Sequence, residues 1–296
     1  MTFWWAYAFV ASFFLAMYVY CNQVFKLPAP LLMIYRGLGV FLLMLPFALT
    51  LSPQFGWLFY FLCAVNGIFI GYIDNRFFRS AKAFGAEATG IAQPLSLVVT
   101  FLSWTVIKPE YFMSLISNPF HFIIILLSLA GILTSIFILK NSQTSKKALL
   151  YLLPCIVVSG LLDTNNKNIM DLGKATPLIA VYFYTMVTAL FSGIYSIVKY
   201  IRNGRDLREI WKTKNMKKGF FVIFFIIGLV VFKGYAIGLA PNPAYVVAIV
   251  YLAPLWISAI NSVQAHIMQK NAYKKMNIKI IILLVASVIS LVLATS

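Results

Sequence analysis

The chain has 296 residues, of which 62% are hydrophobic and 10% are charged, and its mean hydropathy is +0.90. This composition excludes an ordinary soluble protein and predicts an all-α polytopic membrane protein. The net charge of +17 would fit a nucleic-acid-binding surface, but nearly all the basic residues lie between apolar runs. We therefore expect a lipid bilayer around the helices and no nucleic-acid partner.

Apolar runs of about 20 residues, separated by Pro, Gly and charged residues, predict ten transmembrane helices. In chain order they cover residues 4–20, 30–50, 56–73, 83–107, 119–139, 148–163, 177–198, 219–238, 243–265 and 278–295. The odd-numbered connections carry most of the Lys and Arg residues, and the even-numbered ones carry only Lys108, Lys167 and Lys174. The positive-inside rule then predicts that the odd-numbered connections face the cytoplasm and that both termini lie on the outer side of the cytoplasmic (inner) membrane.

The two halves of the chain, residues 1–145 and 146–296, resemble each other in their chemistry. Their alignment places Pro94 opposite Pro254, inside the fourth and ninth predicted helices. Each half holds five helices, so the second half enters the membrane upside down. Two inverted five-helix repeats are typical of secondary transporters, whose site lies between the halves near the bilayer midplane.

Small residues and prolines recur at matching places in the two halves, at residues 86–90, 93–95, 234–241 and 253–255. In these residues the chain resembles the drug/metabolite transporter superfamily, specifically its ten-helix EamA-type carriers built from two five-helix repeats. The resemblance implies export or uptake of a small polar metabolite, such as an amino acid, a nucleotide-like compound or a related ion. We expect a secondary carrier that works by alternating access and uses no cofactor and no metal.

A few charged residues fall within the predicted helices, where an ionised side chain needs a partner or a water-filled cavity. Arg36 and Glu87 lie at similar depth from the cytoplasmic side, while Asp163 and Lys233 lie toward the outer side. One interpretation is structural: Arg36 pairs with Glu87 or Asp74, and Lys233 extends its stem to the headgroups. The other is that these charges bind an ionic substrate or a coupling proton, for which Glu87 is the natural carrier.

A stripe of polar side chains runs along the fourth predicted helix at spacings of three and four residues. Gln93, beside Pro94, is its strongest candidate ligand because a buried amide has several hydrogen-bonding groups to satisfy. For any single Ser or Thr, packing between helices is the commoner role. The predicted substrate-binding residues are Arg36, Glu87, Gln93, Ser96, Thr100, Asp163, Lys233, Tyr251 and Asn261.

Two glycine pairs have the Gly-x-x-x-Gly spacing, Gly67 with Gly71 in the third helix and Gly234 with Gly238 in the eighth. This spacing favours close packing of helices. Because the two helices hold equivalent places in the repeats, we expect contacts that slide as the two halves rock.

Three other classes of protein stay open as alternatives: an enzyme, a scaffold subunit and a channel. A channel would need a ring of like residues lining its pore, which one chain of this size does not show. An integral-membrane enzyme would need a nucleophile with a base or a metal cluster, but neither of the two histidines has a neighbouring acid at ligand spacing. The sequence also contains no H-E-x-x-H or G-x-S-x-G motif, so we do not expect an enzyme. A scaffold subunit that transports nothing would need neither aligned polar residues nor a repeat.

Overall fold

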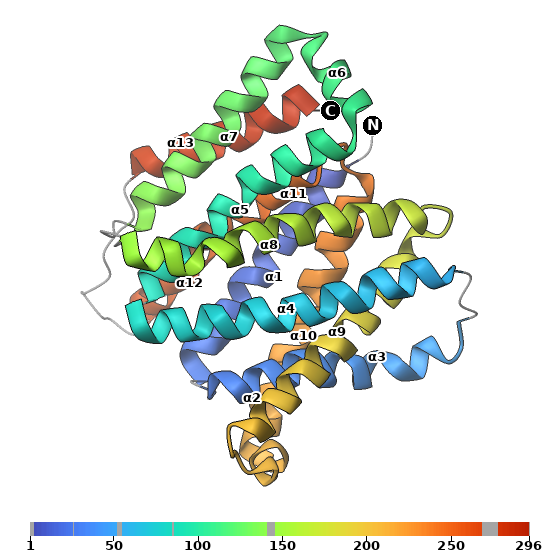
Figure 1. Ribbon diagram of the computed structural model, residues 1–296. Helices are drawn as coiled ribbons and strands as arrows, with labels where there is room; N and C mark the ends of the chain where they lie inside the picture. Colours follow the sequence, from blue (N-terminus) through green and yellow to red (C-terminus); the bar gives the residue numbers. More distant parts are fainter. Residues whose placement is uncertain are drawn as a thin grey trace.

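A computed structural model describes residues 3–25, 27–51, 55–84, 86–140, 146–267 and 278–295. These residues are almost entirely helical and contain no β-strand (Figure 1). The elements include a π-helical turn, η1, and a short 3₁₀ helix, η2. In chain order they are α1 (Trp4–Phe25), α2 (Ala29–Ile34), η1 (Tyr35–Gly39), α3 (Val40–Ala48), α4 (Trp57–Phe84), α5 (Ala86–Ile107), α6 (Pro109–Ile116), α7 (Pro119–Lys140), α8 (Lys146–Leu172), α9 (Pro177–Arg202), η2 (Leu207–Trp211), α10 (Thr213–Leu239), α11 (Pro243–Val250), α12 (Ala253–Ile267) and α13 (Ile278–Thr295).

Within the described residues, nine helical stretches are long and apolar enough to cross a membrane. They confirm the prediction of an all-helical polytopic membrane protein. The predicted helix at 83–107 corresponds mainly to α5, whose apolar part, Pro94–Ile107, is shorter than the other stretches. The count of ten therefore stays a prediction.

The predicted end of the third helix, at residue 73, is wrong. α4 continues to Phe84, so that Arg76 lies on the helix and not in a connection. The guanidinium of Arg76 donates through Nε and Nη2 to the backbone oxygen of Tyr151, at 3.1 and 2.9 Å, and lies 4.4 Å from the centre of the Tyr151 ring. Because the guanidinium of Arg76 is bonded to a residue of α8, its charge is accommodated within the bundle and α4 continues past it.

The end of the sixth helix was predicted too early for the same reason. α8 continues to Leu172, which places Asp163 in the interior of a helix and not at its outer end. Lys167, predicted to lie in a connection, is also on α8 and is buried. Its ammonium donates to the backbone oxygen of Gly238 at 2.7 Å and lies 3.1 Å from the carboxylate of Asp171.

Two of the predicted helices are interrupted. The second contains the π-helical turn η1 between α2 and α3, and the ninth divides into α11 and α12 at Tyr251 and Leu252. Pro94 lies inside α5 as predicted, but Pro254 lies in the first turn of α12, so its predicted place inside a helix is wrong. A proline suits a first turn because no helical hydrogen bond needs its missing N–H.

The helices pack mainly in pairs. α1 packs on α10, α4 packs on both α8 and α9, and α5 packs on α8. α7 and α13 pack on each other and lie side by side at one edge of the bundle (Figure 1). The largest buried hydrophobic cluster joins residues of α1, α3, α4, α5, α7, α8, α9, α10, α11 and α13, so the core is shared by both halves of the chain.

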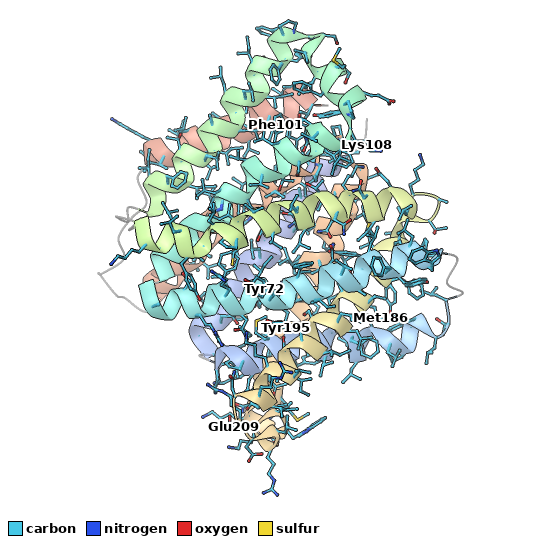
Figure 2. The ribbon with its side chains drawn as sticks, in the orientation of Figure 1. Tyr72, Phe101, Lys108, Met186, Tyr195 and Glu209 are labelled. Atoms are coloured by element: carbon cyan, nitrogen blue, oxygen red, sulfur yellow. The ribbon has the colours of Figure 1, made fainter. Side chains whose placement is uncertain are left out.

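The first glycine pair lies in a close contact between α4 and α9. A Cβ atom on Gly67 would come within 2.5 Å of the backbone oxygen of Thr188, and one on Gly71 within 2.8 Å of the Tyr195 ring. Figure 2 shows Tyr195 on α9 beside α4. At Gly67 the two helices therefore touch almost backbone to backbone, and at Gly71 the side chain of Tyr195 packs against the glycine.

The second pair is in a looser contact. A Cβ atom on Gly234 would meet Val181 of α9 at 3.4 Å, and one on Gly238 would meet Met170 of α8 at 3.4 Å. Both are ordinary van der Waals distances. The two glycine pairs therefore have the same spacing in the sequence but different packing, which is tight in the first pair and ordinary in the second.

A third close contact brings η1 and α9 together. A Cβ atom on Gly37 would lie 2.4 Å from the Cα atom of Gly193, and one on Gly193 would lie 2.6 Å from the backbone nitrogen of Leu38. Here the backbones of the two halves of the chain come into contact, and the side chain of Leu38 packs against Gly193.

Candidate functional site

A cavity of about 260 Å³ lies inside the bundle, and helices of both halves line it. Most of its wall is apolar. Both interrupted helices reach it, since η1 contributes Arg36 and the turn between α11 and α12 contributes Tyr251. The polar side chains of the wall are Tyr18, Arg36, Asp74, Ser96, Ser159, Asp163, Asn166, Tyr184, Thr185, Thr188, Ser192, Lys233 and Tyr251.

The first half of the chain contributes an ion pair between η1 and α4. Arg36 Nη1 lies 2.5 Å from Asp74 Oδ2, and the two side chains are 22% and 17% exposed. The guanidinium also lies 6.0 Å from the centre of the Tyr18 ring. Of the two partners proposed for Arg36, the structure brings Asp74 to it, whereas the side chain of Glu87 lies outside the described residues.

The second half contributes another ion pair, between α8 and α10. Lys233 Nζ donates to Asp163 Oδ1 at 2.6 Å, and the Asp163 side chain is only 9% exposed. Lys233 thus points into the cavity and not along its helix to the headgroups. We call these contacts the first-half ion pair (Arg36–Asp74) and the second-half ion pair (Asp163–Lys233).

An amide cluster joins α4, α8 and α9 beside the cavity. Asn66 Nδ2 donates to Asn166 Oδ1 at 2.6 Å, and the hydroxyl of Tyr184 donates to the same oxygen at 2.5 Å. Asn165 Nδ2 in turn donates to Asn66 Oδ1 at 2.7 Å. None of these residues was predicted as a ligand. Asn165 and Asn166 fell in the expected connection between the sixth and seventh helices, whereas Asn66 and Tyr184 lay within predicted helices and were not singled out.

The predicted polar stripe of α5 reaches the cavity at one described residue. Ser96 lines the wall, and its hydroxyl lies 3.2 Å from the hydroxyl of Tyr251, another predicted ligand. Thr100 is elsewhere: it donates to the backbone oxygens of Ser96 and Gly160 at 2.9 and 3.3 Å, within the contact between α5 and α8. The side chains of two further predicted ligands, Gln93 and Asn261, lie outside the described residues.

The charges of the described cavity wall balance. Arg36 and Lys233 are opposed by Asp74 and Asp163, and each cation is paired with an acid from its own half of the chain. Burying unpaired charge in an apolar bundle is costly. The pairing lets the cavity hold four charged groups without a net charge.

No protein-family model matches the chain, and a comparison with curated proteins finds no match.

Proposed function

We propose that the protein is a secondary carrier that moves a small polar metabolite across the cytoplasmic membrane by alternating access. The observation that carries this proposal is the cavity, whose wall includes four charged and several polar side chains inside a largely apolar bundle. Ionisable residues within a membrane protein mark substrate or ion pathways. Interrupted helices such as those at η1 and at Tyr251 commonly surround the binding sites of secondary transporters.

The pairing of the helices supports an inverted repeat. If each predicted helix is exchanged with the one five places away in the chain, several contacts between helices correspond to others. The contact of α1 with α10 corresponds to that of α8 with α4, and the contact of α5 with α8 corresponds to that of α11 and α12 with α1. The contact of α4 with α9 corresponds to that of α10 with η1 and α3. A twofold relation between the halves explains this correspondence, and a cavity between such halves is open to each side in turn.

The positions of the chain ends support the proposed topology. The two ends of the described chain lie near each other, at the side of the molecule where α5 ends (Figure 1). Lys108 lies at that side as well, whereas Glu209, in the basic connection between α9 and α10, lies at the far end (Figure 2). We propose that the end with Glu209 faces the cytoplasm.

The test is transport by the purified protein in liposomes. A pooled set of labelled amino acids, nucleotides and small organic ions should contain at least one compound whose uptake is saturable and depends on the protein. A variant that fills the cavity, Ser192→Phe, should abolish this uptake, while Ser114→Phe, on the exposed face of α6, should not. A folded protein that moves no compound of the set would refute the proposal.

A further inference from the structure

We propose that Asn166 recognises the carboxylate of the ligand, and that the ligand is a small zwitterion with one carboxylate and one ammonium group. This inference rests on the proposed carrier function and names the class of its substrate.

The first step concerns the orientation of the Asn166 amide. Its oxygen already accepts two hydrogen bonds, from Asn66 and Tyr184, which is as many as an amide oxygen has lone pairs. The Nδ2 group must therefore point away from both donors, and Asn166 lines the cavity while being only 8% exposed. Among the described residues Nδ2 has no hydrogen-bond partner. Two N–H donors in a nearly buried position thus face the cavity and need an acceptor.

The second step concerns the charges nearest to this amide. Asp163 lies three residues before Asn166 on α8, which places both on one face of the helix, and Lys233 Nζ is bonded to Asp163. The ammonium of Lys233 and the amide of Asn166 are both donors, as a carboxylate requires. Asp163 uses Oδ1 for Lys233, so its second oxygen is the matching acceptor for a ligand ammonium group.

The third step concerns net charge and size. Because the described cavity wall is neutral, a ligand with a net charge would leave one buried charge without a partner, whereas a zwitterion leaves none. A volume of about 260 Å³ is below the range of about 300–1,000 Å³ that is usual for ligand sites. The ligand is therefore a compact molecule.

The first experiment uses the unaltered protein. Binding and uptake of labelled L-alanine, L-serine, L-threonine and L-valine are measured in liposomes, each with its methyl ester, which lacks the carboxylate charge, and its N-acetyl derivative, which lacks the ammonium group. We expect saturable binding of at least one amino acid, and at least tenfold weaker competition by both of its derivatives. Equal competition by either derivative would overturn the inference, and so would the absence of binding by all four amino acids.

The second experiment removes the donor without removing the acceptor. Asn166→Asp keeps an oxygen for Asn66 and Tyr184 but loses the N–H groups that face the cavity. We expect at least tenfold weaker binding of the amino acid, with binding of its methyl ester not weakened. The matched control is Asn168→Asp, the same change on α8 outside the cavity wall, which should bind within about threefold of the unaltered protein. Binding unchanged in Asn166→Asp would contradict the assignment.

The outcomes separate this inference from the carrier function. If the pooled transport assay finds only compounds that are not zwitterions, the inference fails and the carrier function stands. If no compound is transported, the carrier function itself fails. A melting curve for each variant shows whether it is folded, and if Asn166→Asp is not, the competition by the derivatives on the unaltered protein decides.

Discussion

In the proposed repeat, α4 and α10 hold corresponding places in the two halves of the chain, yet they contribute differently to the cavity wall. α4 carries an acid, Asp74, and a glycine pair pressed against α9; α10 carries a base, Lys233, and a glycine pair in ordinary contact. Both charges are paired within their own half. The difference is that the glycines of α4 are required for its close approach to α9, whereas Gly234 and Gly238 of α10 stand where a methyl group also has room.

Loss of the second-half ion pair should have the largest effect on stability. Lys233→Met keeps the length of the side chain but leaves the carboxylate of Asp163, which is 9% exposed, buried without its cation. Breaking such a pair costs about 3–5 kcal/mol. The expected loss in free energy of unfolding is measured by denaturation in detergent micelles.

A double variant serves as the control for this prediction. Lys233→Met with Asp163→Asn has no stranded charge and should recover most of the lost stability, because a neutral replacement of a buried pair is often tolerated. A double variant as unstable as Lys233→Met alone would show that packing of the lysine stem, and not its charge, was lost.

Loss of the first-half ion pair should have a smaller effect. Arg36→Met strands Asp74, whose side chain is more exposed than that of Asp163, at 17%. We expect a loss near the lower end of the same range, about 3 kcal/mol, measured in the same way. A larger loss in Arg36→Met than in Lys233→Met would reverse our ranking of the two pairs.

The glycine pairs allow the comparison to be tested without any charge. Gly67→Ala places a Cβ atom against the backbone of α9 and should cost about 1–3 kcal/mol, as overpacking does. Gly234→Ala has room for its methyl group and should not lower the melting temperature, since alanine favours a helix. Equal melting temperatures of the two variants would show that α4 and α10 are packed alike.

An ion pair outside the cavity should have the smallest effect. Lys212 Nζ lies 3.9 Å from Glu209 Oε1, and the two side chains are 64% and 42% exposed. Surface pairs of this kind contribute about 0–1 kcal/mol, so Lys212→Ala should leave the unfolding curve nearly unchanged. A loss similar to that of Arg36→Met would mean that the connection between α9 and α10 has a stabilising role that its exposure does not suggest.

The sequence predicted the helices well because hydropathy reports directly on burial in lipid. The ends were harder to predict, since Arg76 and Lys167 were read as marks of a connection. Their partners, Tyr151, Asp171 and Gly238, come from neighbouring turns or other helices. The sequence alone does not show which residues of other helices will pair with a charged side chain.

The same dependence on neighbouring helices explains which residues of the site could be predicted from the sequence. The charges Arg36, Asp163 and Lys233 were found because an ionised group in an apolar run is conspicuous. Asn166 was missed because an amide next to a predicted helix end resembles an ordinary connection. Thr100 followed the periodicity of the stripe, yet periodicity assigns a residue to a helix face without saying whether a cavity or another helix lies opposite.

The crossing of Gly37 and Gly193 has a mechanical consequence. A Cβ atom at either glycine would overlap with the opposite chain, so the close approach of η1 and α9 depends on both glycines. The crossing joins the first half to the second next to Arg36 in the cavity wall. In the carrier that we propose, this contact would be the point about which the two halves tilt, so that the space widens on one side of the membrane as it narrows on the other.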